Sequence, residues 1–265
     1  NRKNKHAARL RFLFDELGED KFRELLTKEI EEVKNDGDWE LELESQKEEV
    51  KSIGGEDITL NRKQQLWWDR FVYDQKQNGL YGCKIPINLG DIDVNDAKKL
   101  ALALDGLGED IIRCASDQNI YLRNLTKKEL LGLYDLIINI SSDSKKATLF
   151  GDMVACTGAA TCQLGITRPR GALNAIARAL DELELDSLKG FKIHLSGCPN
   201  SCGKHQVADL GFYGKVSRNG NHSYPAYNVI AGAVVKEGES RFAIKCGEIA
   251  GFYIAQFTKE VLALW

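Results

Sequence analysis

Two pairs of cysteines constrain this 265-residue chain more than any other feature of its sequence. Cys156 and Cys162 enclose five residues, whereas Cys198 and Cys202 enclose three. Small residues surround both pairs: Gly158, Ala159, Ala160, Gly197, Ser201 and Gly203. Such residues let a backbone close around a bulky group. The fold is therefore expected to build a site from these two segments.

Four thiolates suit either an iron–sulfur cluster or a zinc ion. Zinc sites usually use cysteine pairs separated by about two to four residues, so the wider Cys156–Cys162 spacing fits zinc poorly. Without metal, the cysteines would pack as small buried hydrophobes. The spacing favours metal binding, with an iron–sulfur cluster ahead of zinc. Cys83, Cys114 and Cys246 stand alone and are expected to be buried apolar thiols.

The second pair follows an expected strand at residues 191–195, and Pro199 suits the first turn of a helix. That helix would present Cys198 and Cys202 on one face, because side chains four residues apart lie above one another. Its first backbone N–H groups would then hydrogen-bond anionic sulfur.

Composition excludes several classes of function. The net charge is -3 and the isoelectric point about 5.9, so no basic field invites nucleic acid. No apolar run is long enough to span a bilayer, and no signal peptide is visible. The odd count of seven cysteines argues against a secreted disulfide framework and for a cytoplasmic protein. The chain begins with Asn1, which suggests a fragment or a processed product.

The apolar pattern predicts three consecutive parts. Residues 1–60 should form a helical segment, interrupted at Gly18, and an acidic linker. Residues 61–145 should form a small ferredoxin-like half-domain, and residues 146–265 a domain of mixed sheet with helices. The predicted fold class is α+β.

Short strands and helices alternate within the second and third parts. Strands are expected at residues 80–89, 110–116, 120–125, 191–195, 207–216 and 227–235. Helices are expected at residues 95–107, 126–138, 170–185 and 249–265. Thr126 and Glu129 stand in capping-box spacing at the start of one helix.

Several stretches resemble one known family. Residues 153–162, 196–203 and 206–212 resemble the nitrite and sulfite reductases that contain sirohaem and a [4Fe–4S] cluster. Residues 1–13 look like the helical segment that joins the two halves of those enzymes. Residues 110–113 and 117–119 look like the cofactor-facing strand and turn of their second half. The resemblance therefore covers essentially the whole chain.

The resemblance implies a role for each matching residue. The cluster ligands would be Cys156, Cys162, Cys198 and Cys202. Cys202 would also be the catalytic residue, because its sulfur would reach the sirohaem iron. The residues implied to bind the cofactor are Arg113, Gln118, Asn119, Asn200 and Cys202. Two positions depart from the family pattern: Ala115 replaces a common Thr, and Ala231 replaces the first of a common Gly-Gly pair.

The implied activity is the six-electron reduction of nitrite to ammonia, or of sulfite to sulfide, at sirohaem coupled to the [4Fe–4S] cluster. Residues 155–158 and 200–201 look closer to nitrite reductases. Electrons would come from a separate donor such as a ferredoxin or a flavoprotein, since no G-x-G-x-x-G fingerprint supports nicotinamide binding. The family's anion-binding residues lie mainly in an N-terminal half that is missing here, so this chain alone would lack a complete active site.

Two other functions remain open at this point. One is a non-catalytic iron–sulfur module that borrows the half-fold, and the other is a zinc-binding structural domain. Near the cysteines, Lys204, His205, Arg168 and Arg170 could supply charge or protons, but a solvated or packing role is equally compatible with their sequence context.

Overall fold

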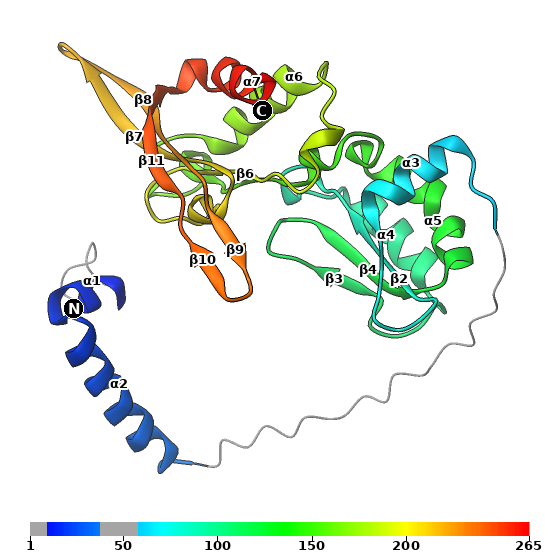
Figure 1. Cartoon of the computed structure of the whole chain (residues 1–265), viewed down its shortest axis with the longest axis horizontal. Helices are drawn as coiled ribbons and strands as arrows, with labels where there is room; N and C mark the ends of the chain where they lie inside the picture. The colour runs from blue at the N-terminus through cyan, green and yellow to red at the C-terminus, as the bar shows by residue number, and fades with distance from the viewer. Residues whose placement is uncertain (1–9, 38–57, 265) are drawn as a thin grey trace. The chain divides into compact units, whose positions relative to one another are not determined.

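The computed structural model describes residues 10–37 and 58–264, which belong to two units, residues 1–52 and 53–265 (Figure 1). The first unit contains α1 (Leu10–Leu17) and α2 (Glu19–Lys34). Gly18 separates the two helices at a φ of 74°, a left-handed conformation that favours glycine, as the sequence predicts. The predicted acidic linker lies outside the described residues from position 38 onward.

The second unit begins with a ferredoxin-like half. Its elements are α3 (Arg62–Phe71), β1 (Val72–Asp74), β2 (Tyr81–Ile85), α4 (Val94–Leu104), β3 (Ile112–Cys114), β4 (Ile120–Leu125) and α5 (Lys127–Ile140). The strands form an antiparallel sheet of order β1-β2-β4-β3. The predicted capping box of Thr126 and Glu129 starts α5. A second box, Asn61 with Gln64, starts α3, which the sequence analysis missed.

Apolar side chains of α3, α4 and α5 pack on this sheet and form its core. Its most buried members include Trp67, Phe71, Cys83, Ile85, Leu100, Leu122, Leu125, Leu130 and Ile137. The predicted strand at residues 110–116 is shorter than expected, because Asp110 has a φ of 60° and turns the chain before β3. From β2 onward the order of strands and helices follows the prediction, whereas α3 and β1 were not predicted.

The cysteine-bearing part follows. Its main elements are β5 (Met153–Ala155), α6 (Pro169–Leu180), β6 (Ile193–Ser196), β7 (Leu210–Asn219), β8 (His222–Ala231), β9 (Val234–Lys236), β10 (Glu239–Arg241), β11 (Ile244–Ala250) and α7 (Ile254–Ala263). Its five-stranded sheet has the order β11-β8-β7-β6-β5. Strands β5, β6 and β7 are parallel, whereas β8 and β11 are antiparallel to their neighbours. The sheet is therefore mixed, as predicted.

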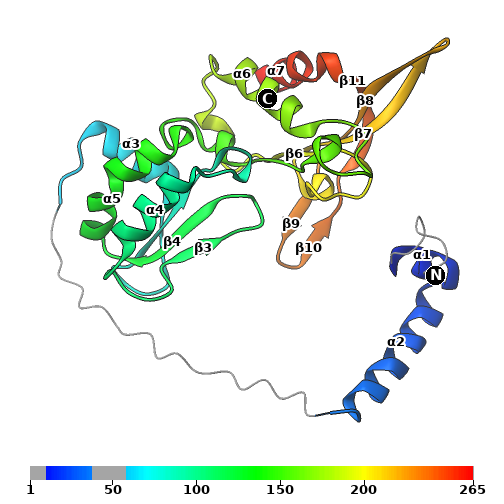
Figure 2. The ribbon, with the colours of Figure 1, turned by 180° about the vertical axis from the view of Figure 1, so that it is seen from behind.

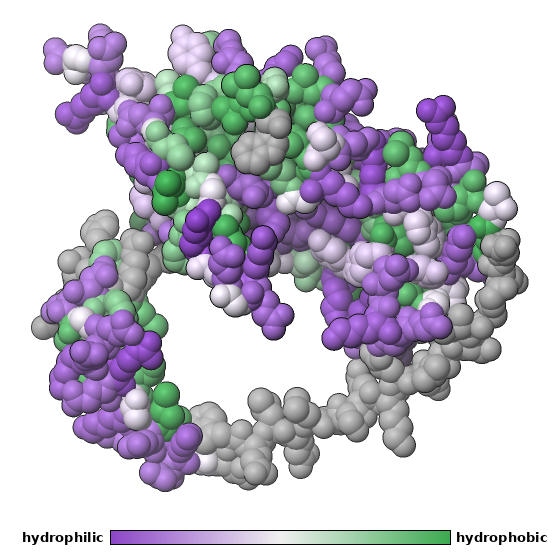
Figure 3. Space-filling model, in the orientation of Figure 1, coloured by the Kyte–Doolittle hydropathy of each residue, from purple (hydrophilic) through white to green (hydrophobic). Residues whose placement is uncertain are grey.

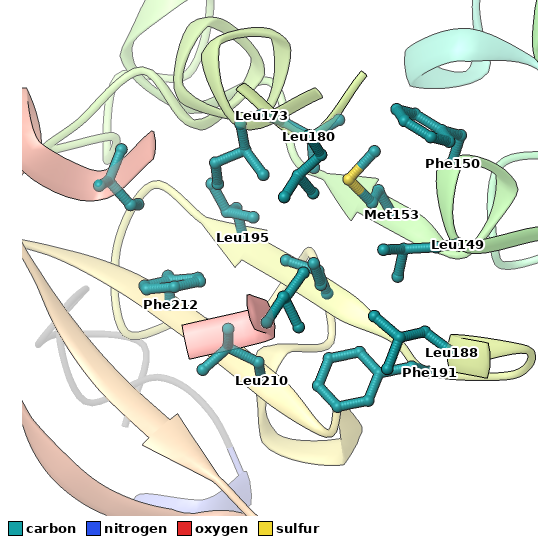
Figure 4. Packing of buried hydrophobic residues seen from close by; sticks show 14 of the residues in the cluster. Leu149, Phe150, Met153, Leu173, Leu180, Leu188, Phe191, Leu195, Leu210 and Phe212 are labelled. Atoms are coloured by element: carbon teal, nitrogen blue, oxygen red, sulfur yellow. The ribbon is translucent and has the colours of Figure 1, made fainter. Parts of the chain in front are cut away.

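Helices α6 and α7 lie side by side against this sheet (Figure 2). Leu173 and Leu180 of α6 pack with Leu195, Leu210 and Phe212 of the strands (Figure 4). The hydrophilic tip of the β7–β8 hairpin projects from the core (Figure 3). A separate hairpin pairs β9 with β10. Among the described residues, none of the helices combines the length and apolar character needed to cross a membrane.

The end of the chain departs from the prediction of one helix at residues 249–265. Ile249 and Ala250 belong to β11, where they pair with Tyr227 and Ala226 of β8. The helix α7 therefore starts only at Ile254. The α+β class, with a ferredoxin-like half followed by a mixed sheet with helices, is confirmed.

Candidate metal centre

The two cysteine pairs start at the carboxyl ends of two adjacent parallel strands. Cys156 follows β5 directly, and Cys198 lies two residues beyond the end of β6. The strands pair with Ala155 opposite Leu195, so they end at the same edge of the sheet. Neighbouring strand ends bring segments that are distant in sequence together.

Backbone hydrogen bonds join the two cysteine segments. Gly197 N–H donates to Cys156 Sγ at 3.1 Å, and Cys156 N–H donates to Leu195 O, also at 3.1 Å. The N–H groups of Ile166 and Thr167 both donate to Gly197 O, at 2.8 and 3.0 Å. The thiol of Cys156 therefore lies against the first residue of the second segment.

Glycines make this close approach sterically accessible. A Cβ on Gly197 would lie 2.7 Å from Gly158 Cα, and one on Gly214 would lie 2.4 Å from Gly197 O. Gly158 itself has a φ of 55°, and a Cβ there would lie 2.1 Å from Pro169 Cδ. A side chain at Gly197 would push the two cysteine segments apart, and one at Gly158 or Gly214 would displace the residues that pack around them.

The four thiols differ in exposure. Cys198 is 8% exposed and Cys156 is half-buried, whereas Cys162 and Cys202 are exposed. Burial raises the pKa of the Cys156 thiol, and the negative charges of Cys202 and Cys198 raise it further, while hydrogen bonds from Gly197 and Gly158 lower it. Cys156 is thus within electrostatic range of both members of the other pair.

These donors fit an iron–sulfur cluster. Cysteine thiolates are the usual ligands of such clusters, and four of them come from two segments in backbone contact. Within residues 10–37 and 58–264, no three side chains of His, Cys, Asp or Glu gather in a group that could hold a metal ion, so the approach of all four sulfurs to one cluster stays a prediction.

The prediction of a helix that carries both Cys198 and Cys202 is wrong. Ser201 and Lys204 have φ values of 59° and 55°, so residues 197–203 form turns rather than a right-handed helix. The chain folds back on β6 so closely that a Cβ on Gly203 would lie 2.1 Å from Leu195 O. The N–H groups that reach the Cys156 sulfur belong to Gly197 and Gly158 and not to the start of the predicted helix.

A serine and a histidine hold the second cysteine segment, and the sequence analysis assigned neither this role. Gly203 N–H donates to Ser196 Oγ at 3.1 Å, and His205 Nδ1 lies 2.8 Å from the same oxygen. Burial, followed by the charge of His194, lowers the pKa of His205 to about 4. His205 is therefore neutral at neutral pH and supplies no positive charge there. One feature of the sequence could have identified Ser196: it is a polar residue at the end of an expected strand, directly before Gly197 and Cys198.

Gln118 and Asn119, predicted to bind the cofactor, direct their amides at protein groups. Gln118 donates to Ala155 O at 3.0 Å and accepts from Ala155 N–H at 3.2 Å. Asn119 is 4% exposed; it accepts from Ile87 N–H at 2.9 Å and donates to Gly151 O at 2.7 Å. Both residues thereby join the ferredoxin-like half to the cysteine-bearing part.

The remaining predicted cofactor residues lie in different places. Arg113 is exposed on β3, where its guanidinium pairs with Asp110 at 2.8 Å beside a cavity of about 450 Å³ between α4 and β3. Asn200 is half-buried in the turn between Cys198 and Cys202. Their contact with a cofactor stays a prediction.

Other residues singled out from the sequence also have definite surroundings. Arg168 is exposed, whereas Arg170 pairs with Asp91. Lys204 donates to Ser116 Oγ at 2.9 Å. Of the three lone cysteines, Cys83 is buried as predicted. The prediction is wrong for Cys114 and Cys246, which are exposed on β3 and β11.

Two family models match the chain. The model described as "Nitrite and sulphite reductase 4Fe-4S domain" matches residues 150–254. The model described as "Nitrite/Sulfite reductase ferredoxin-like half domain" matches residues 73–139. The first contains both cysteine pairs, and the second contains the antiparallel sheet except for Val72.

Similar proteins are nitrite reductases. The chain is 28% identical to a ferredoxin–nitrite reductase of Synechococcus elongatus and to a chloroplastic one of Spinacia oleracea; each match covers 83% of this chain, and respectively 39% and 34% of the relative. An assimilatory ferredoxin-dependent nitrite reductase of Haloferax mediterranei is 27% identical, over 91% of this chain and 40% of the relative. The chain thus spans well under half the length of these relatives.

A solved structure shares the fold. The NirA protein of Mycobacterium tuberculosis superposes with a TM-score of 0.67 at 22% identity, covering 100% of this chain and 46% of that one. The fold, the two domain models and the similar relatives agree. Over residues 73–139 and 150–254 the chain matches the two domain models of the nitrite and sulphite reductase family.

Proposed function

We propose that this chain is the cluster-bearing part of an enzyme that reduces nitrite to ammonia. Cys156, Cys162, Cys198 and Cys202 would hold one [4Fe–4S] cluster. The observation that carries the proposal is the hydrogen bond from Gly197 N–H to Cys156 Sγ, which ties one cysteine segment to the other. Such N–H groups stabilise the negative charge on a ligating sulfur.

We propose that residues 146–265 are the domain that binds the cluster and sirohaem. Residues 61–145 would be the ferredoxin-like half-domain, and residues 1–60 a helical segment with a linker. The match of the 4Fe-4S domain model to residues 150–254 supports the first assignment. The match of the half-domain model to residues 73–139 supports the second.

Sirohaem, when bound, would supply the iron at which nitrite accepts six electrons, and the cluster would supply those electrons singly. Cys202 would be the ligand shared by the two cofactors, as the resemblance of residues 196–203 to the family implies, and it is exposed to solvent, as Cys162 is. Asn200 lies two residues before Cys202 and would face the macrocycle. Arg113 would pair with a sirohaem carboxylate by exchanging its present partner, Asp110.

The names of the similar proteins support nitrite over sulfite as the substrate and a ferredoxin as the electron donor. Cationic groups that bind the anion would lie in the part of the enzyme that this chain does not span. This chain covers 34–40% of the length of these relatives, and the anion-binding part would correspond to the rest of that length.

The test is to load the full chain anaerobically with iron and sulfide and to measure both elements together with the visible and electron paramagnetic resonance spectra. We expect about four irons and four sulfides per chain and a brown cluster spectrum. Replacement of any of the four cysteines by serine should reduce cluster content, whereas Cys246→Ser, at an exposed lone cysteine, should not.

Two outcomes would contradict the proposal. Uptake of one zinc ion without sulfide would make this a zinc-binding structural domain. The second outcome concerns a preparation that also contains the remaining length of the enzyme. If the chain there holds a cluster but binds no added sirohaem, it is a non-catalytic iron–sulfur module.

A further inference from the structure

Strand β5 has an open edge immediately before the first cysteine. It is the last strand of its sheet, next to β6. The N–H of Cys156 turns toward β6, where it donates to Leu195 O at 3.1 Å. Ala155 is only 1% exposed, so its own backbone groups on the other side need partners within the protein.

Gln118 supplies both of these partners. Its Nε2 donates to Ala155 O at 3.0 Å, and its Oε1 accepts from Ala155 N–H at 3.2 Å. A primary amide carries one donor group and one acceptor group in the arrangement of a peptide unit. The side chain of Gln118 therefore replaces, for one residue, the neighbouring strand that β5 lacks.

The turn that carries Gln118 is itself fixed in the ferredoxin-like half. Gln118 has a φ of 67°, and its N–H donates to Ala115 O at 3.1 Å. Ala115 N–H in turn donates to Asn119 O at 3.0 Å. Asp117, beside it, accepts hydrogen bonds from Asn119 at 2.9 Å and from Tyr121 at 2.7 Å. The amide is thus held by elements that belong to the other core.

We propose that Gln118 is a positioning residue for Cys156. By pairing with both backbone groups of Ala155, it fixes from the ferredoxin-like half the direction in which the Cys156 thiol leaves β5. This inference rests on the proposed [4Fe–4S] site for its effect on a cluster, whereas the positioning of Cys156 itself does not need metal. A displaced ligand sulfur changes the hydrogen bonding and solvent access of a cluster, which set its reduction potential.

The chain offers a matched control in Gln75. Its amide also pairs with one residue, Asn124, accepting from the backbone N–H at 2.6 Å and donating to Oδ1 at 3.0 Å. Asn124 lies at the end of β4 opposite the Gln118 turn. Gln75→Leu therefore removes an equivalent pair of hydrogen bonds from the same half-domain, but at the far end of the strand.

The first measurement is hydrogen exchange of residues 150–162 in the full, metal-free chain. Gln118→Leu removes both hydrogen bonds to Ala155, and we expect exchange at Ala155 and Cys156 to accelerate about tenfold or more. Gln118→Glu keeps the acceptor and loses the donor, so its exchange should be intermediate. Gln75→Leu should leave exchange in this segment at the wild-type rate.

The second measurement is the reduction potential of the cluster and its rate of iron release to a chelator, in the full chain loaded with iron and sulfide. We expect Gln118→Leu to shift the potential and to accelerate iron release, with Gln75→Leu unchanged. Equal effects of the two variants would overturn the inference, because they would report general loosening of the half-domain. Wild-type exchange, potential and release in Gln118→Leu would overturn it as well.

The failure of the proposed function is distinguishable from the failure of this inference. If the wild-type chain takes up no iron and sulfide, the proposed function fails, and exchange alone decides on Gln118. Accelerated exchange at Cys156 in Gln118→Leu would then still support positioning, and unchanged exchange would overturn it.

Discussion

Ser196, the last residue of β6, holds the turn that carries Cys198 and Cys202. Ser196 is only 1% exposed. Its hydroxyl oxygen accepts a hydrogen bond from Gly203 N–H at 3.1 Å and lies 2.8 Å from His205 Nδ1. His205 is neutral at neutral pH, so its Nδ1 can accept a hydrogen bond from the Ser196 hydroxyl while Nε2 carries the ring proton. One hydroxyl thus satisfies a buried donor and a buried acceptor.

We expect Ser196→Ala to lower the free energy of unfolding by about 1–3 kcal/mol, because it leaves both buried groups without this partner. Urea unfolding of the metal-free chain measures this loss. Iron release should also be faster in the loaded chain, since the turn with two of the proposed ligands is released from β6.

Ser217→Ala provides the control for this prediction. Ser217 is 8% exposed on β7, and its hydroxyl donates to Glu248 at 2.8 Å, within the sheet and away from the cysteine turn. This variant should lose stability without a change in iron release. Equal release rates in the two serine variants would show that Ser196 contributes only to general stability.

Single residues differ in how far the sequence reveals them. The four cysteines could be singled out because paired thiols among glycines are a local pattern. The partner of Gln118 could not be, because Ala155 lies 37 positions away and the contact depends on how two cores pack. The turn at Cys198 was mistaken for a helix because Pro199 suits both structures, and the deciding feature is the positive φ of Ser201.

At the scale of elements, Lys84 of β2 connects the two sheets. Its ammonium lies 2.7 Å from Asp152, just before β5, and 3.2 Å from Asp117, in the turn before β4. The three side chains are 14–25% exposed. Burial raises the pKa of Asp152 despite the charge of Lys84, which opposes that rise. Lys84 therefore neutralises two carboxylates that would otherwise repel each other.

We expect Lys84→Met to destabilise the chain by about 3 kcal/mol at pH 7, because it leaves two partly buried carboxylates without their cation. The cost should be smaller near pH 4, within the usual range of carboxyl titration. The pKa of Asp152 in the folded state is already raised, and it should rise further in the variant. Protonation of Asp152 therefore stabilises the folded state at low pH, and this stabilisation is lost as the pH increases.

Urea unfolding at a series of pH values checks this prediction, with Lys215→Met as the control. Lys215 pairs with Glu248 at 2.6 Å, and both side chains are about one-third or more exposed, so its loss should cost about 0–1 kcal/mol at each pH. A cost of Lys84→Met that is constant across the pH range would argue against the coupled carboxylates.

The elements that were predicted well carry strong local signals. Helix α5 has a capping box and a buried apolar stripe, and β4 places Leu122 and Leu125 in the core between a turn and the start of α5. Strand β11 was missed because it lies at the sheet edge and none of its residues is fully buried, so it lacks a strong apolar alternation. Its pairing with β8 is a tertiary contact that local propensity does not encode.

At the scale of the whole molecule, two hydrophobic cores share one compact unit of residues 53–265. The α+β class and the order of its parts followed from alternating patterns, and the family from the cysteine segments. The hydrogen bonds between the cores could not be predicted, because Gln118 and Asn119 look like ordinary turn residues in the sequence. They connect the cysteine-bearing sheet to the half-domain through Ala155 and Gly151.

The last prediction concerns turnover by this chain alone. Nitrite is an anion, and its binding requires cationic groups directed at the site. Three of the cations predicted near the cysteine segments or the cofactor already have partners, because Lys204 bonds to Ser116, Arg170 to Asp91 and Arg113 to Asp110. The fourth, Arg168, is exposed. We therefore expect the chain, loaded with iron, sulfide and sirohaem, to be reduced by a strong artificial donor yet to form ammonia at no more than the background rate.

Ammonia production and reoxidation of the reduced cluster by nitrite, followed together, test this expectation. Addition of a polypeptide that corresponds to the remaining length of the relatives should restore ammonia formation, because it would bring the anion-binding cations. Sustained ammonia formation by the chain alone would show that the cations within it are sufficient. Arg113→Gln, Arg168→Gln, Arg170→Gln and Lys204→Gln would then identify which of the four cations binds the anion.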